Sequence, residues 1–222
     1  MSPLLLLAGV QRLEGTPATI LRKLTVAALA AATLLLGVTA AGGSHSWEAF
    51  HWPDDHLSPT VASRTTSSLY NVPAAVEEWA DLGTPIQPVF VPGTSADVVV
   101  ASWFSFTWLG LARIFVDADG HITRGQVLLN TPLLRFYSPA VADHVLCQET
   151  GHIWGLEHNR DGDIGGTPDN TCMNDVGHLG QYTTPNSHDV EQLNTIYNHA
   201  DGASEPASSG GRWITVHAFP IP

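Results

Sequence analysis

Apolar residues recur along this chain with helical spacing in three places. The predicted helices cover residues 72–83, 138–154 and 187–198. In the first, Val72, Val76 and Trp79 fall on one face of the helix. The second begins at Ser138 and Pro139, residue types that suit an N-cap and a first helical turn.

The stretch between the first two helices has the pattern of strands. Four strands are predicted, over residues 86–91, 96–104, 111–116 and 122–130. The second of them is almost continuously apolar, which is typical of a strand covered on both faces. Residues 117–120 have the composition of a tight turn and predict a hairpin between the last two strands. The order of elements indicates an α+β fold with a twisted, mostly parallel sheet beside two long helices.

The N-terminal 42 residues have the pattern of an export signal. Arg22 and Lys23 precede an apolar run over residues 24–38, and small residues follow at 39–41. Residues 1–20 form an extension before this pattern. We expect cleavage and secretion, and an uncleaved membrane anchor is the alternative.

The remainder of the chain is acidic. Residues 1–42 contain one acidic and three basic residues of the 21 and 9 in the whole chain, so the remainder has a net charge of about −14. It contains no Lys. This composition argues against binding to nucleic acid or to an anionic membrane.

The second helix carries residues with the spacing of a metal site. Gln148 and His152 lie one turn apart on one helix face, and Glu149 lies between them. Gly155 permits a sharp turn that returns His158 to the same place. Three such ligands can hold a tetrahedral metal with one position open to water, and Glu149 can accept the proton of that water.

These residues resemble the active site of the metzincin zinc endopeptidases, in particular their matrixin branch. That family carries HExxHxxGxxH followed by a Met-turn. QETGHIWGLEH, residues 148–158, fits this spacing at every fixed position except the first, and residues 171–174 resemble the Met-turn. The resemblance implies that His152 and His158 bind Zn²⁺, that Glu149 is the general base, and that Met173 forms the floor beneath the metal.

The resemblance covers roughly residues 66–200 and implies a metzincin-like fold with an active-site helix, a Met-turn and a C-terminal helix. We therefore expect four segments: the signal region 1–42, an irregular segment 43–65, a metallopeptidase domain 66–200, and a linker with a C-terminal tail 201–222. The expected function is a secreted, monomeric endopeptidase acting on proteins or peptides. An extended substrate is expected to pair with a sheet edge formed by Val127, Leu128, Leu129 and Asn130.

Gln148 departs from the family pattern, because an amide oxygen is a weaker zinc ligand than imidazole. Three alternatives follow: Gln148 ligates through its oxygen, another residue such as Asp161 or Asp163 completes the site, or the domain is a catalytically silent protein that binds peptides. His144 lies two helical turns from His152, about 12 Å away along the axis, and is expected to be a packing residue.

Two further features of the sequence bear on the site. Cys147 and Cys172 predict a disulfide between the helix and the Met-turn, with two buried thiols as the alternative. Residues 161–170 are rich in oxygen ligands and suit either Ca²⁺ or simple turns. The remaining histidines show no ligand spacing, and we expect most of them on the surface.

Overall fold

The computed structural model describes residues 46, 50–159, 170–174, 179–201 and 211–221, and the account below concerns the unit formed by residues 43–222. The predicted signal region, Asp161, Asp163 and most of the predicted linker lie outside the described residues. Among the described residues, no helix has the length and hydropathy that a membrane crossing requires.

The described elements comprise a strand-rich first half, three helices and a C-terminal strand. The helical elements are η1 (Asp54–His56), α2 (Val72–Ala80), α3 (Thr131–Leu134), α4 (Pro139–Ile153) and α5 (Ser187–Ile196). The strands are β1 (Thr60–Ser63), β2 (Val89–Phe90), β3 (Val98–Ser102), β4 (Trp108–Val116), β5 (Ile122–Leu129) and β6 (Arg212–Pro220). The predicted helices correspond to α2, α4 and α5, and the predicted hairpin corresponds to β4 and β5.

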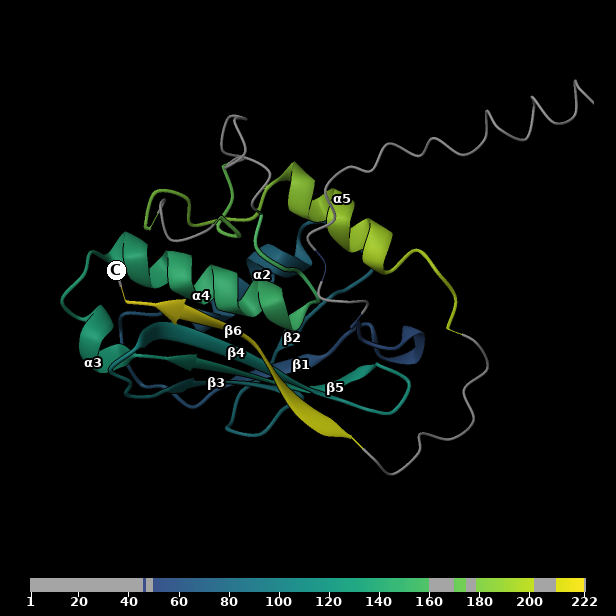
Figure 1. The fold of residues 1–222 in the computed structure, drawn as a ribbon, viewed down its shortest axis with the longest axis horizontal. Coiled ribbons are helices and arrows are strands. Elements are labelled where there is room, and N and C mark those ends of the chain that lie inside the picture. The colour runs from purple at the N-terminus through teal and green to yellow at the C-terminus, as the bar shows by residue number, and fades with distance from the viewer. Residues whose placement is uncertain (1–45, 47–49, 160–169, 175–178, 202–210, 222) are drawn as a thin grey trace, which may run out of the picture. The chain divides into compact units, whose positions relative to one another are not determined.

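The strands form one mixed sheet in the order β2-β1-β3-β5-β4-β6. Strands β2, β1, β3 and β5 pair in parallel, whereas β4 pairs antiparallel with both β5 and β6. Figure 1 shows α4 against one face of this sheet and α5 farther from the sheet. The architecture is α+β, as the sequence predicts.

The predicted substrate edge is wrong. Residues Val127, Leu128 and Leu129 belong to β5, which is hydrogen-bonded to β3 on one side and β4 on the other. Asn130, directly after β5, is buried and donates its side-chain amide to the carbonyls of Ser105 and Trp108 at 2.7 Å each. The C-terminal strand β6 forms the edge on this side of the sheet, because it pairs along the length of β4.

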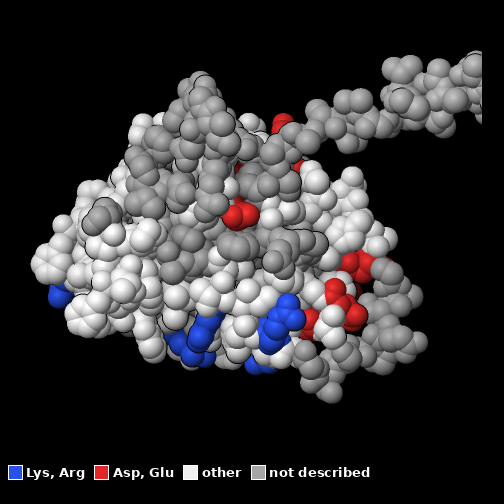
Figure 2. All heavy atoms as spheres, in the orientation of Figure 1, with Lys and Arg blue, Asp and Glu red and all other residues white. Residues whose placement is uncertain are grey.

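The face of the sheet away from α4 carries charged and aromatic side chains. Arg113 lies over the ring of Trp213 at 5.0 Å, and Arg124 lies over Phe115 at 4.7 Å. Arg113 also donates to Gln126 at 2.7 Å. Figure 2 shows the basic side chains along the margin where Figure 1 draws the strands. Cation–π contacts of this kind contribute roughly 0.5–1 kcal/mol each at exposed sites.

The prediction that the second strand is covered on both faces holds for only one face. Val98 and Val100 of β3 are fully buried. Val99 and Ala101 line a groove of about 500 Å³, which they share with Leu111 and Arg113. The apolar run therefore reflects one covered face and one partly open groove.

Helix α4 is buried along almost all of its length, and glycines in the sheet let it approach closely. A Cβ at Gly125 of β5 would lie 2.7 Å from Ile153 Cγ2, and a Cβ at Gly110 of β4 would lie 2.5 Å from Val145 Cγ1. Pro139 is in the first turn, and α4 ends before Gly155, which has φ of +97°. The backbone can make this turn because glycine tolerates positive φ.

Strand β6 contributes Phe219 to the core under α4. Phe219 is fully buried and meets the ring of His144 edge-on at 5.7 Å. We expect Phe219→Ala to lower the free energy of unfolding by about 3–5 kcal/mol, because it leaves a cavity in packed surroundings. The control is Phe136→Ala, since Phe136 is 79% exposed, and it should change stability by less than about 0.5 kcal/mol. Urea denaturation measures both, and equal effects would contradict this role for β6.

Candidate metal centre

The two histidines of the motif come together in the interior. His152 lies in the last turn of α4 and is fully buried, and His158 follows the turn at Gly155 and is 5% exposed. Their rings stack with centroids 5.0 Å apart and planes inclined by 19°. The chain reversal at Gly155 thus brings two imidazoles side by side.

A hydrogen bond sets the orientation of the His152 ring. Its Nδ1 lies 2.7 Å from the carbonyl oxygen of Leu156, which can only accept. Nδ1 therefore carries the hydrogen, and in the neutral ring Nε2 is left with its lone pair. Metal-binding histidines in proteins are typically held by this kind of contact.

Gln148 is fully buried on the face of α4 that carries His152 one turn later. Its Nε2 donates to the carbonyl of Asn174, the residue after Met173, at 2.5 Å. Its Oε1 has no hydrogen-bond partner among the described residues. A buried acceptor left in this way costs roughly 1–3 kcal/mol. A cation or a bound water at this oxygen would offset that cost.

The carboxylate of Glu149 is fully buried against β4. A Cβ at Gly110 would lie 2.6 Å from Glu149 Oε1 and 2.7 Å from Glu149 Cγ. The absence of a side chain at Gly110 thus makes the room that Glu149 occupies. Glu149 is therefore not an exposed residue of the helix surface, which is the ordinary position of a Glu in a helix.

Met173 packs against the same helix. A Cβ at Gly151 would lie 2.4 Å from Met173 Sδ and 2.7 Å from Trp79 of α2. Cys172 forms a disulfide with Cys147 of α4, with Cα atoms 6.0 Å apart. In the chain-entropy model a loop of this length contributes about 3 kcal/mol. The disulfide and the thioether contact hold the Met173 segment beside the motif.

The end of α4 is also held by an N-terminal segment and by α5. Trp52 Nε1 donates to the carbonyl of Ile153 at 3.0 Å, and the Tyr197 hydroxyl donates to the carbonyl of Trp154 at 3.0 Å. Burial raises the pKa of Tyr197, so its hydroxyl remains protonated and keeps this bond. Two carbonyls at the helix end are satisfied just before the turn at Gly155.

His144 is a packing residue, as the sequence predicts. It is fully buried, its Nδ1 accepts from the amide of Gly180 at 3.2 Å, and its ring meets Phe219 edge-on. The predicted alternatives Asp161 and Asp163, and the predicted calcium loop apart from Asn170, lie outside the described residues.

A second polar cluster was not predicted. His51, His121, His199 and Asp201 come from three separate segments, and the ligand atoms of His51, His199 and Asp201 lie within 4.8 Å of one another. Partial burial alone would raise the pKa of Asp201, but hydrogen bonds from His51 and the Asp54 amide, with the histidine charges, lower it to about 2. The only local signal in the sequence is the pair His199 and Asp201, two residues apart.

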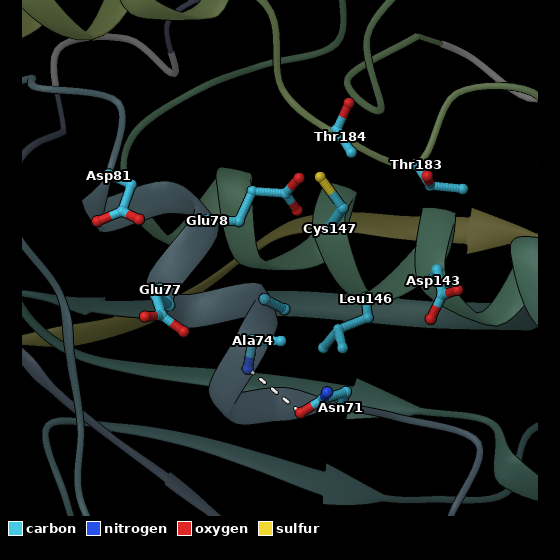
Figure 3. Close-up of a pocket in the computed structure, with 11 residues that line it drawn as sticks. Asn71, Ala74, Glu77, Glu78, Asp81, Asp143, Leu146, Cys147, Thr183 and Thr184 are labelled. Atoms are coloured by element: carbon cyan, nitrogen blue, oxygen red, sulfur yellow. Dashed lines mark hydrogen bonds between the residues drawn. The ribbon is translucent and has the colours of Figure 1, made fainter.

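A cavity of about 470 Å³ lies between α2 and α4, away from the motif histidines. Figure 3 shows carboxylates of Glu77, Glu78 and Asp81 from α2 and of Asp143 from α4 around it. Burial raises the pKa of Glu78, and the nearby charge of Asp143 adds to this effect. The cavity contains none of the predicted catalytic or metal-binding residues, so it is a separate feature.

The motif residues suit a divalent cation. The donor set comprises an orphaned amide oxygen on Gln148, the imidazole of His152, whose Nδ1 bonds to Leu156, and the adjacent ring of His158. Imidazole and oxygen donors in this number are the ligands of Zn²⁺ sites that keep one position open.

The comparisons with known proteins find a similarity to solved structures. Neither a scan against protein-family models nor a search of curated proteins finds a match to this sequence. Two structures of myroilysin are similar. One alignment covers 71% of this chain and 99% of that chain, with 13% identity and a TM-score of 0.44. The other covers 86% and 100%, with 11% identity and a TM-score of 0.38. The functional argument therefore rests on the residues of the site.

Proposed function

We propose that this chain is a secreted, zinc-dependent endopeptidase of the matrixin type, acting as a monomer on proteins or peptides. The observation that carries the proposal is that α4 buries both the Glu149 carboxylate and His152, whose ring stacks on that of His158 after the turn at Gly155. Gln148 Oε1, His152 Nε2 and His158 would hold the metal. Export is supported by the apolar run over residues 24–38 and the small residues that follow it.

When bound, Zn²⁺ lowers the pKa of water and polarises a carbonyl group. Glu149 accepts a proton from the attacking water and then gives a proton to the leaving amine. Its position against Gly110 keeps bulk water away from the carboxylate. The Nδ1 bond from His152 to Leu156 holds the imidazole still during these transfers.

Glutamine in place of the family's histidine at position 148 affects the zinc affinity of the site more than the charge of the site. Amide and neutral imidazole are both uncharged ligands, so the charge that acts on water and substrate is unchanged by this difference. The amide oxygen is the weaker donor, and the expected cost is therefore in zinc affinity. The bond from Gln148 Nε2 to Asn174 turns the oxygen away from that carbonyl and fixes its direction.

An extended peptide is proposed to add to strand β6. This strand forms the sheet edge next to β4, and its residues pack beneath α4. A free strand edge offers main-chain donors and acceptors at regular spacing to a peptide.

The second candidate function is a catalytically silent domain that binds peptides on the same scaffold. Its support is Gln148, which stands where the family has its first histidine ligand and donates its amide to the carbonyl of Asn174. The two candidates differ in whether the purified protein cleaves a peptide bond.

We predict that Glu149→Gln lowers kcat by at least about 100-fold while zinc content is retained, because only the proton acceptor is lost. Cleavage of an unfolded protein substrate, with and without chelator, measures activity, and metal analysis measures zinc. The control Glu191→Gln changes an exposed carboxylate of α5 and should leave kcat unchanged. Equal activity of Glu149→Gln and the wild type would rule out this base.

Gln148→His supplies the imidazole of the family pattern. We predict that it raises zinc affinity by more than about 10-fold, because a stronger donor replaces the amide. Zinc titration with a competing chelator measures the affinity, and cleavage assays accompany it. If the wild type cleaves and the variant cleaves at lower free zinc, the endopeptidase proposal stands. If only the variant cleaves, the natural chain is a silenced protease and the binding function is correct.

A further inference from the structure

Three histidines and an aspartate form a cluster at the end of the sheet away from α3. His51 precedes η1, His121 follows the turn of the β4–β5 hairpin, and His199 and Asp201 follow α5. Figure 1 draws the hairpin and η1 at the same end of the domain, and Figure 2 shows acidic side chains gathered there. The cluster shares no residue with the motif on α4.

The ligand atoms of this cluster are spaced for a small cation. Asp201 Oδ1 lies 3.0 Å from His51 Nε2, 3.3 Å from His121 Nε2 and 3.4 Å from His199 Nε2. His51 Nε2 and His199 Nε2 are 3.1 Å apart. Four ligands about 2.0–2.1 Å from a tetrahedral Zn²⁺ lie roughly 3.3–3.4 Å from one another. The three distances among His51, His199 and Asp201 fall close to that value, whereas His121 does not lie within 4.8 Å of all the other ligand atoms and stands outside this set.

Hydrogen bonds alone fit this arrangement poorly. If His51 and His199 both donate from Nε2 to Asp201, both nitrogens carry a hydrogen although they lie only 3.1 Å apart. If His199 Nε2 instead carries no hydrogen and accepts from His51, its lone pair faces the carboxylate oxygen at 3.4 Å. A cation among these atoms accepts every lone pair and removes both conflicts.

The ligands are held in place by further contacts. Asp201 Oδ2 accepts from the Asp54 amide at 2.7 Å, and the Asp201 amide donates to Asp54 at 2.9 Å, so that Oδ1 is turned toward the histidines. The amide of His121 donates to Asp117 Oδ1 at 2.9 Å, and His121 Nδ1 lies 3.6 Å from Asp117 Oδ2. Asp117 thus holds His121, whose Nε2 lies 3.3 Å from the ligand Asp201.

We propose that His51, His199 and Asp201 form a second metal site of the Zn²⁺ type, with His121 beside Asp201. Imidazoles together with a carboxylate are typical ligands of Zn²⁺ and related transition metals, whereas Ca²⁺ takes oxygen ligands. A metal held by these three residues joins the segment before η1 to the segment after α5, with the fourth tetrahedral position left to water.

The second site holds the segment that supports the turn of the first. Trp52, next to His51, donates to the carbonyl of Ile153, and the carbonyl of Phe50 lies 2.6 Å from where a Cβ would stand on Gly155. The ligand His199 follows Tyr197, which bonds to Trp154. Metal in the cluster therefore fixes both segments against the turn that leads to His158.

The test is the zinc content of the purified protein and of its Asp201→Asn variant. The variant keeps the shape of the side chain and removes the anionic ligand. Asp97→Asn is the matched control, because Asp97 also accepts from a histidine, His56 at 3.1 Å, and from a backbone amide, Thr60 at 2.8 Å. We expect Asp201→Asn to hold about one zinc equivalent fewer, with affinity at this site weakened more than about 100-fold, and the control to match the wild type.

Stoichiometry separates this proposal from the proposed function. If both sites bind, the wild type holds about two equivalents, and if the site on α4 fails it holds about one; in either case Asp201→Asn loses one. Zinc should also raise the unfolding temperature of the wild type and the control above that of Asp201→Asn. Should Asp201→Asn fail to fold, His199→Asn replaces it, because His199 is a partly exposed member of the ligand set. Zinc-free wild-type protein, or equal zinc in the wild type and these variants, would overturn the proposal.

Discussion

The close contact of α4 with the sheet is the constraint on which the rest of the site depends. Gly110 and Gly125 leave no side chains between the helix and strands β4 and β5, so Val145, Glu149 and Ile153 reach the sheet directly. A carboxylate on that face is then buried, and elsewhere on the helix Gln148 meets Asn174 and Gly151 meets Met173. A methyl group at either glycine would collide with α4 and move the whole motif.

The middle and the C-terminal end of α4 are fixed by different means. Its middle is joined to Cys172 by the disulfide, and its C-terminal carbonyls are bonded by Trp52 and Tyr197. Because the turn at Gly155 follows directly, the position of His158 depends on segments that lie about 100 residues upstream and 40 residues downstream in the chain. These bonds fix the backbone on both sides of the turn that brings His152 and His158 together.

The pattern of residues along the chain predicted those elements that depend on interactions between residues close in sequence. Apolar spacing, Pro139 and Gly155 predicted α4 and its end, and the turn residues at 117–120 predicted the β4–β5 hairpin. The motif spacing also predicted that His152 and His158 lie together. The edge of the sheet was predicted wrongly, because β5 lies between its hairpin partner β4 and strand β3, and the pairing with β3 joins segments that are not adjacent in the chain. The cluster around Asp201 was missed for the same reason, since its ligands meet only through the tertiary fold.

The central claim is that the residues at 148, 152 and 158 bind a divalent metal although the first is glutamine. The most direct measurement is anomalous X-ray diffraction at the zinc edge from crystals of the wild-type protein grown with zinc. The account predicts a strong anomalous peak bounded by Gln148 Oε1, His152 Nε2 and the His158 ring. Well-ordered side chains at these three positions with no anomalous peak between them would contradict it.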